Sequence, residues 1–226
     1  MIRRSDVVLV AASGLAREAA VAIDAGSRYR VRGIVDDDPF TWDTDCGGHR
    51  VLGGLDALAQ LPRTRVVVCA GKGAARRAIV QRLQQMGIDR DRFATVIHPR
   101  ATVGARSFVG AGSILLAGAV VTTDARVGMH VVVMSNAVIT HDDELHDFAT
   151  ICSSVTLAGR VTVEPEVYVG ASAAVRQDCT LGAGAVIGLG AVVLRDVPAG
   201  QTWVGNPAAQ LGVSSAQTSL TAEYGG

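Results

Sequence analysis

One short segment of the chain holds an unusual concentration of ionisable side chains. The stretch ITHDDELHDFATI, residues 139–151, contains two histidines and four carboxylates, and within it His141 is followed directly by Asp142. An imidazole whose second nitrogen is held by a carboxylate can take a proton from a substrate near neutral pH. The pair is therefore a candidate general base, set against the alternative that both side chains are ordinary solvated turn residues.

A six-residue repeat surrounds this pair. Counting in sixes from Ile97 to Val193, all seventeen positions are Ile, Val or Leu, and a small or β-branched residue lies four places after each of them, with Asp143 as the exception. This period is typical of a parallel β-helix in which three hexads complete one coil. Seventeen hexads predict between five and six coils. Because the register never slips, no loop is inserted, and an active site must lie on the wall of the prism.

The repeat also places the remaining polar residues of the segment. Asp143 occupies the small inward position, and because an unpaired buried carboxylate is costly, we expect it to bend toward His141 or another neighbour. His146 follows Leu145 at a corner position that Gly usually takes, which favours a structural role. The prediction is therefore that the chemistry of this segment rests on His141 and Asp142.

Before residue 97 the pattern changes to strands that alternate with helices. Buried-strand runs occur at residues 6–11, 31–35 and 65–70, and helical composition occurs at 15–25 and from 73 to about 86. Such alternation predicts a small parallel sheet with right-handed crossovers, which is a Rossmann-like α/β domain.

Three loops at the carboxyl ends of these strands are candidate binding sites. They carry Ser13 and Gly14, then Asp36 and Asp37, and finally Lys72, which is the only lysine of the chain. Ligands of open α/β sheets bind at this edge, and the helix N-termini that follow two of the loops favour a phosphate. The first loop lacks the G-x-G-x-x-G pattern, so glycine turns that merely connect elements are the alternative, and for Lys72 a solvated loop residue.

The composition excludes several classes of protein. The 226 residues are 49% hydrophobic and 19% charged, which is enough apolar sequence for a folded core. The formal net charge is zero and no basic block is present, so nucleic acid is not an expected partner. The sequence has no run as apolar and long as a membrane span and no signal-peptide segment, so we expect a cytoplasmic protein. Four widely spaced cysteines without a C-x-x-C pair favour reduced thiols and no metal site.

Taken together, these features resemble the hexapeptide-repeat sugar acetyltransferases, namely the sialic acid O-acetyltransferase-like proteins and the nucleotide-amino-sugar N-acetyltransferases. The resemblance covers roughly residues 6–211 and rests on the Rossmann-like domain, on IHP at 97–99, on coils with a His-acid pair, and on VGNPA at 204–208. It implies a left-handed β-helix and a homotrimer. It also implies acetyl-CoA between neighbouring prisms and a nucleotide-linked amino sugar against the N-terminal domain.

The resemblance assigns roles by position. His141 is similar to the family's general base and Asp142 to the carboxylate that raises its basicity. The family often has a second histidine nine residues later that contacts the thioester region of acetyl-CoA, and here Thr150 takes that place. Ala171 and Leu189 occupy coil positions whose backbones meet acetyl-CoA.

The N-terminal loops follow the family only in part. Residues 13–14 and 36–37 match the positions that hold the nucleotide sugar, but the family's Gly-rich turn and histidine are replaced by Ala11-Ala-Ser-Gly-Leu15. The missing histidine places recognition of the sugar in doubt.

We therefore predict a Rossmann-like, nucleotide-sugar-binding domain at residues 1–95, a left-handed β-helix acyltransferase domain at 96–211 and a flexible tail at 212–226. The expected reaction moves an acetyl group from acetyl-CoA to the amino group of a nucleotide-linked amino sugar. Two alternatives stay open, an O-acyltransferase on a sugar or natural-product hydroxyl that uses the same His141, and a non-catalytic trimeric scaffold. The acceptor and the length of the acyl chain are not encoded in any of these patterns.

Overall fold

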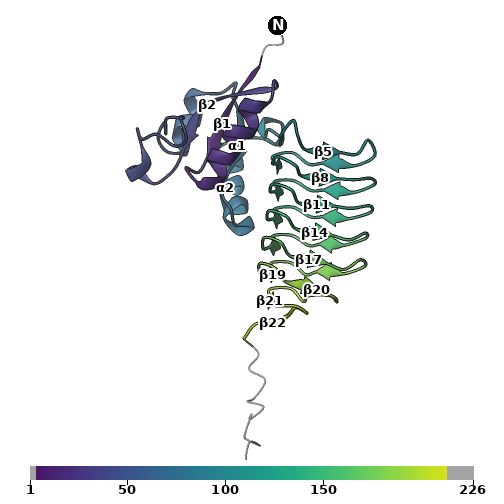
Figure 1. Cartoon of the computed structure of the whole chain (residues 1–226). Coiled ribbons are helices and arrows are strands. Elements are labelled where there is room, and N and C mark those ends of the chain that lie inside the picture. The colour runs from purple at the N-terminus through teal and green to yellow at the C-terminus, as the bar shows by residue number, and fades with distance from the viewer. Residues whose placement is uncertain (1–3, 213–226) are drawn as a thin grey trace, which may run out of the picture.

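A computed structural model describes residues 4–212, which form a small α/β unit beside a long triangular prism (Figure 1). The predicted tail lies outside the described residues except for Gly212. The α/β unit has three parallel strands in the order β2-β1-β3. Its elements are β1 (Ser5–Val10), α1 (Gly14–Ala25), β2 (Tyr29–Val35), β3 (Arg65–Val68) and α2 (Gly73–Gln85). The predicted Rossmann-like arrangement is thereby confirmed. No helix within residues 4–212 is long and apolar enough to cross a membrane.

The helices begin where the sequence offers capping groups or glycine. Ser13 is the N-cap of α1, and its Oγ accepts a hydrogen bond from the Ala16 amide at 3.2 Å. Three short 3₁₀ helices were not predicted, because helices of so few residues show no periodic pattern of apolar residues. They are η1 (Pro39–Thr41), η2 (Leu55–Gln60) and η3 (Arg90–Arg92).

The strands of the prism from β4 to β20 have two residues each, and each of them ends on one of the seventeen predicted aliphatic residues; β21 and β22 follow the repeat. The eight-stranded sheet contains β4 (Val96–Ile97), β7 (Ile114–Leu115), β10 (Val132–Val133), β13 (Thr150–Ile151), β16 (Tyr168–Val169), β19 (Val186–Ile187), β21 (Thr202–Val204) and β22 (Ala209–Gln210). The six-stranded sheet contains β5 (Thr102–Val103), β8 (Val120–Val121), β11 (Val138–Ile139), β14 (Thr156–Leu157), β17 (Ala174–Val175) and β20 (Val192–Val193). The five-stranded sheet contains β6 (Phe108–Val109), β9 (Arg126–Val127), β12 (Glu144–Leu145), β15 (Thr162–Val163) and β18 (Thr180–Leu181).

Successive coils stack in parallel with a shift of eighteen residues. Ile139 of β11, for example, lies opposite Val121 of β8 and Leu157 of β14. Most of the inward aliphatic residues are fully buried, and each contributes roughly 1.5–3 kcal/mol by leaving water. The exceptions are in the first coil, which no coil covers: Ile97 is 41% exposed, and Val103 and Val109 are half-buried.

Three rows of turns join the three sheets. We call the turns from the six-stranded to the five-stranded sheet the second corner, and those from the five-stranded to the eight-stranded sheet the third corner. Residues at the second corner adopt left-handed backbone angles, with φ of 56° at Asp124, 61° at Asp142 and 61° at Arg160. Asp tolerates this conformation because its short side chain can bond locally.

The α/β unit covers one side of the prism. Residues of α1 pack with Ile114 and Val132 on the outer face of the eight-stranded sheet, and α2 begins against the third corner. A Cβ atom at Gly73 would lie 2.3 Å from the Phe148 carbonyl oxygen, so glycine permits this approach. In Figure 1 the turns that follow β5, β8, β11 and β14 extend from the opposite side of the prism. The second corner is therefore free of the chain's own α/β unit.

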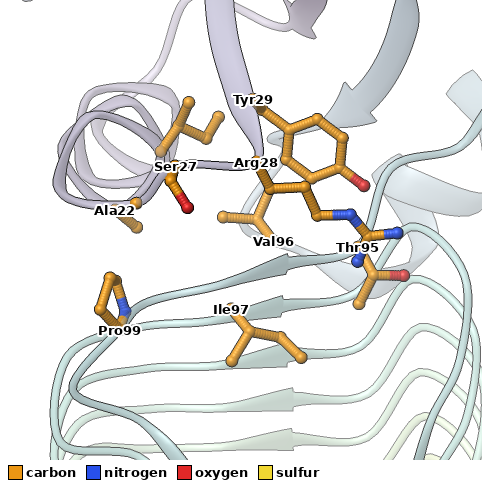
Figure 2. Close-up of a pocket in the computed structure, with 10 residues that line it drawn as sticks. Ala22, Ser27, Arg28, Tyr29, Thr95, Val96, Ile97 and Pro99 are labelled. Atoms are coloured by element: carbon orange, nitrogen blue, oxygen red, sulfur yellow. The ribbon is translucent and has the colours of Figure 1, made fainter. Parts of the chain in front are cut away.

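A small cavity of about 220 Å³ marks the junction between the end of α1 and the first coil (Figure 2). Arg28 lies beside it, with its guanidinium carbon 5.1 Å from the centre of the Tyr29 ring. The rest of its wall includes Ala22, Ile97 and Pro99, which bring no ionisable group.

Candidate active site

His141 and Asp142 form a hydrogen-bonded pair on the second corner, between β11 and β12. Nδ1 of His141 lies 2.8 Å from Oδ2 of Asp142, and both side chains are about half exposed. When Nδ1 donates its proton to the carboxylate, Nε2 keeps its lone pair and can accept a proton from a substrate. The left-handed backbone of Asp142 brings these consecutive side chains together.

The imidazole lies against the next coil at Gly159. A Cβ atom at that position would be 2.2 Å from Cε1 and 2.4 Å from Nε2 of His141, so any other residue would displace the ring. The Gly159 N–H donates to no acceptor within residues 4–212. An unused backbone donor thus lies beside the free face of the imidazole.

The neighbouring charges of the second corner are neutralised in pairs. Arg106 pairs with Asp124 one coil before His141, and Arg160 donates two hydrogen bonds to Asp178, at 2.6 and 3.1 Å, one coil after it. The bonds from Arg160 lower the pKa of Asp178. Asp142 lies between these two pairs and has the imidazole as its partner.

The structure divides the polar cluster of residues 139–151 among different surfaces. Asp143 is buried, with its carboxylate accepting from the amides of Thr140 and Val161 at 2.7 and 2.8 Å, so it turns to neighbouring backbone and not to the imidazole. His146 lies near Glu144, with Nε2 and Oε1 4.0 Å apart. Asp147 accepts from the Met129 amide at 2.7 Å. These residues are close together in the sequence, but only His141 and Asp142 lie in the same site.

A polar groove of about 460 Å³ runs beside the pair along the five-stranded sheet. It is lined by residues that include Arg126, Asp142 and Glu144. Within residues 4–212, no three His, Cys, Asp or Glu side chains are arranged to hold a metal ion.

Thr150 lies under α2 and not beside His141. The residue is fully buried, its Oγ donates to the Gly71 carbonyl at 3.0 Å, and it accepts from Nη2 of Arg76 at 2.9 Å. Its hydroxyl therefore fixes the loop before α2 in this structure. Its contact with acyl-CoA stays a prediction.

Arg76 joins the α/β unit to the prism. Its guanidinium is fully buried and also donates to the carbonyl oxygens of His130, Phe148 and Ala149, and to those of residues 70 and 71. Burial lowers the pKa of Arg76 to about 10, and no carboxylate is among its hydrogen-bond partners. Bonds from one side chain to both units fix the place of the loop that carries Lys72.

A large cavity of about 740 Å³ lies between that loop and the eight-stranded sheet. Lys72 and Gly73 line one wall, and Tyr168 and Val186 line the other. Lys72 is exposed and forms no ion pair with any residue from 4 to 212. A free cation at a helix start beside this cavity suits an anionic ligand.

The side chains of the other N-terminal candidate residues form hydrogen bonds and ion pairs within the protein. Ser13 Oγ donates to the Cys69 carbonyl at 2.7 Å in addition to capping α1. Asp36 accepts from the amides of Ala12 and Asp38, and Asp37 accepts from the Leu55 amide and pairs with Arg82. Asp36 thus fixes the loop that leads to Gly14. Whether these residues also contact a substrate stays a prediction.

Ala171 and Leu189 stack on the remaining row of turns. The Gly190 amide donates to the Ala171 carbonyl at 2.8 Å, and Leu189 is 82% exposed. The two turns present backbone groups and the apolar side chain of Leu189 on the outside of the prism.

Gly159 and Arg76 are the residues that sequence reasoning missed. Gly159 lies eighteen residues after His141, which is one coil, so the repeat alone could have identified it as the ring's neighbour. Arg76 gave no signal, because a buried arginine looks the same in sequence as the exposed Arg77 beside it.

Comparisons with known proteins agree with this architecture. Residues 6–83 match the family model of the PglD N-terminal domain. The structure superimposes on a point mutant of the perosamine N-acetyltransferase from Caulobacter crescentus, solved with CoA and GDP-perosamine, with a TM-score of 0.85 and 27% identity, covering 94% of this chain and 98% of that one. It also superimposes on the acetyltransferase domain of PglB from Neisseria gonorrhoeae with acetyl coenzyme A, with a TM-score of 0.83 and 30% identity, covering 92% and 100%. The predicted α/β domain followed by a left-handed β-helix is confirmed.

A shorter stretch of the chain is similar to an O-acyltransferase. It is 36% identical over 90 residues to the acyl-[acyl-carrier-protein]–UDP-N-acetylglucosamine O-acyltransferase of Herminiimonas arsenicoxydans. The match spans 40% of this chain and about a third (34%) of the length of that relative.

Proposed function

This chain belongs to the hexapeptide-repeat acyltransferase family, and from that premise we propose that it moves an acyl group from acyl-CoA to the amino group of a nucleotide-linked amino sugar. The observation that carries the proposal is the His141–Asp142 pair, joined at 2.8 Å on an exposed corner. Acyl-CoA supplies an activated thioester carbonyl, so the protein needs no nucleophile of its own.

His141 acts as the general base. As the sugar amine forms a bond to the thioester carbon, Nε2 of His141 takes the proton that the nitrogen loses. Asp142 stabilises the imidazolium that results and holds the ring in one tautomer. The proton then passes to the sulfur of CoA as the carbon–sulfur bond breaks, which leaves the amide product, free CoA and a neutral imidazole.

The Gly159 N–H is the donor we assign to the developing oxyanion. It has no acceptor within the described chain and lies beside the imidazole. A fixed backbone donor stabilises charge that appears during the reaction without any reorganisation, and such donors contribute roughly 3–4 kcal/mol in other acyl-transfer enzymes.

We place acyl-CoA along the outer turns that carry Ala171 and Leu189, where the backbone is accessible. Thr150 supports this region from behind, because its bonded hydroxyl holds Gly71 next to the large cavity. No metal takes part in this scheme.

The nucleotide sugar is placed at the carboxyl edge of the α/β sheet. Gly14 lies at the start of α1, where helix amides favour a phosphate, and Asp36 and Ser13 hold this loop in shape. Asp37 lies beside it, and Lys72 provides a positive charge at the rim of the large cavity.

These two halves of the site lie on opposite sides of one chain, which supports a homotrimer with three shared sites. Within residues 4–212, no residue of the second corner belongs to the hydrophobic clusters that join the α/β unit to the prism, so we infer that His141 reaches the N-terminal loops of another copy. The outer face of the six-stranded sheet offers a flat wall for that contact, with half-buried Val120, Val138 and Ala174.

O-acylation is the second candidate, favoured by the match to UDP-N-acetylglucosamine O-acyltransferases. The same imidazole would take the proton of a sugar hydroxyl, so geometry at His141 does not separate the two reactions.

A substrate panel tests the proposal. Acetyl-CoA is incubated with the protein and with UDP-, GDP- and TDP-linked amino sugars or their hydroxyl counterparts, and products are followed by mass spectrometry, because the protein's four free cysteines would obscure a thiol assay. Acetylation of an amino sugar supports the proposal. Acetylation of the hydroxyl counterparts alone supports the second candidate, and no acetylation of any compound would refute both.

A further inference from the structure

We infer that Asp143 is a positioning residue for His141, because its buried carboxylate ties the turn that carries the imidazole to the turn on which the imidazole lies. The inference rests on the proposed role of His141 in acyl transfer.

The carboxylate bridges two successive coils. Oδ2 of Asp143 accepts from the Thr140 amide at 2.7 Å, and Oδ1 accepts from the Val161 amide at 2.8 Å. Thr140 immediately precedes His141, and Val161 is two residues after Gly159. A single side chain, 1% exposed, therefore sets the spacing between the imidazole and its glycine platform.

This bridge replaces the backbone bond that closes other turns of the prism. At Ala137 the amide donates to the carbonyl three residues earlier, at 3.3 Å, and the same bond recurs at Ala149. Residues 143 and 161 make no such bond in the described structure. The His141 turn is therefore closed by a side chain, and a substitution at Asp143 changes the turn itself.

The carboxylate also adds charge near the imidazole. Its two oxygens both accept from amides, which is the bonding of the ionised form. Burial raises the pKa of Asp143, and the amides of Val161 and Thr140 and the nearby His141 act in the opposite direction. The other charged groups around His141 are Asp142 on its own turn and the Arg160–Asp178 pair on the next. Loss of the Asp143 carboxylate should therefore change the charge around the imidazole as well as the turn that carries it.

Two serines provide matched controls, because each forms the same inter-coil bridge in a turn other than that of His141, with Ser113 on a different corner of the prism. Ser107 Oγ accepts from the Ala125 amide at 3.1 Å, and the fully buried Ser113 accepts from the Val131 amide at 3.0 Å. A purely structural bridge predicts equal consequences at all three places.

The test combines NMR spectra of the histidine rings with kinetics on the full-length protein. The wild type, Asp143→Asn, Asp143→Ser and Ser113→Ala are labelled at histidine, and the His141 resonance is assigned as the one lost in His141→Ala. Asp143→Ser introduces the residue type that forms the corresponding bridge at position 107, so this variant is expected to fold. We expect a displaced His141 ring resonance in both Asp143 variants, and kcat reduced at least about tenfold with the acyl-CoA KM nearly unchanged. Ser113→Ala should change only the melting temperature.

Folded Asp143 variants with the wild-type His141 resonance and wild-type kcat would overturn the inference, as would an equal loss of kcat in Ser113→Ala. The spectra need no turnover, so a wild type that transfers no acyl group would refute the proposed function while the link between Asp143 and His141 is still decided by the spectra.

Discussion

Nδ1 of His141 and Oδ2 of Asp142 lie 2.8 Å apart although the residues are consecutive in the chain. Neighbouring side chains of an extended strand point to opposite faces, so this contact depends on the left-handed turn at Asp142, where φ is 61°. The orientation of the imidazole is thus a property of one turn.

Asp142→Asn should lower kcat on the order of tens-fold or more, because the amide stabilises neither the imidazolium nor the required tautomer. The pH profile of kcat should change with it. Asp178→Asn is the matched control, since it breaks the exposed pair with Arg160 on the next turn and leaves the His141 partner in place. An Asp142 variant within about twofold of wild type would remove this carboxylate from the mechanism.

Gly159→Ala should displace the His141 ring, because the added Cβ would lie 2.2 Å from Cε1. We expect kcat to fall roughly tenfold or more while the fold is kept, since His141 is on the surface and can move aside. Gly26→Ala is the control, because a Cβ there meets nothing closer than 3.5 Å. Equal kcat in both variants, measured alongside circular dichroism, would contradict the placement of the ring.

The repeat made most of the prism predictable from sequence. Each inward aliphatic from Ile97 to Val193 ends a strand, because a period of six with no slip has only one way to bury its apolar residues. His141 could be placed on the wall for the same reason. The α/β strands followed from their apolar runs.

The contacts of polar side chains could not be predicted. Thr150 is buried beneath α2, where its hydroxyl bonds to Gly71 and Arg76, and nothing in the repeat indicated these contacts. Asp36 shapes the loop before α1 by accepting from Ala12, a bond between residues 24 positions apart. Such contacts depend on how two domains dock, and no local pattern in the sequence reports that.

Stability should fall in mild acid because of His130. Its ring is nearly fully buried between Phe93 and Phe148, at centroid distances of 4.6 and 5.2 Å, and Nδ1 has no hydrogen-bond partner in the described structure. Burial, together with the charge of Arg76, lowers the pKa of His130 to about 4, whereas Asp147 acts the other way.

His130 therefore binds a proton near pH 6.5 in the unfolded chain but only near pH 4 in the folded chain. The contribution of His130 is complete above the unfolded pKa and is lost as the pH falls toward the folded one. Between pH 7 and pH 5 the free energy of unfolding should fall by about 2 kcal/mol because of His130. Urea unfolding of wild type and His130→Asn at both values measures it, since Asn tolerates the left-handed backbone at φ 54°. An equal pH dependence in the two proteins would exclude His130 as the cause.

Mixed oligomers should reveal a shared site. His141→Ala and the double variant Gly14→Val, Asp36→Ala should each be inactive alone, with the double variant impaired in acceptor binding. Co-expression should restore activity, because an intact corner of one chain meets the intact loops of another. Mixing His141→Ala with Asp142→Asn is the control, because both defects lie on the same corner and no site is repaired. No recovery in the first mixture, or an active monomer in sedimentation equilibrium, would contradict the shared site.

The central claim is that His141 removes the proton of the acceptor during acyl transfer, and the turnover number of His141→Ala tests it most directly. The comparison uses the best acceptor of the substrate panel, with His146→Ala as the control from the same segment and circular dichroism to verify the fold. The account predicts a loss of kcat of about 10²-fold or more in His141→Ala and near wild-type activity in His146→Ala. A folded His141→Ala protein that retains most of the wild-type kcat would contradict the account.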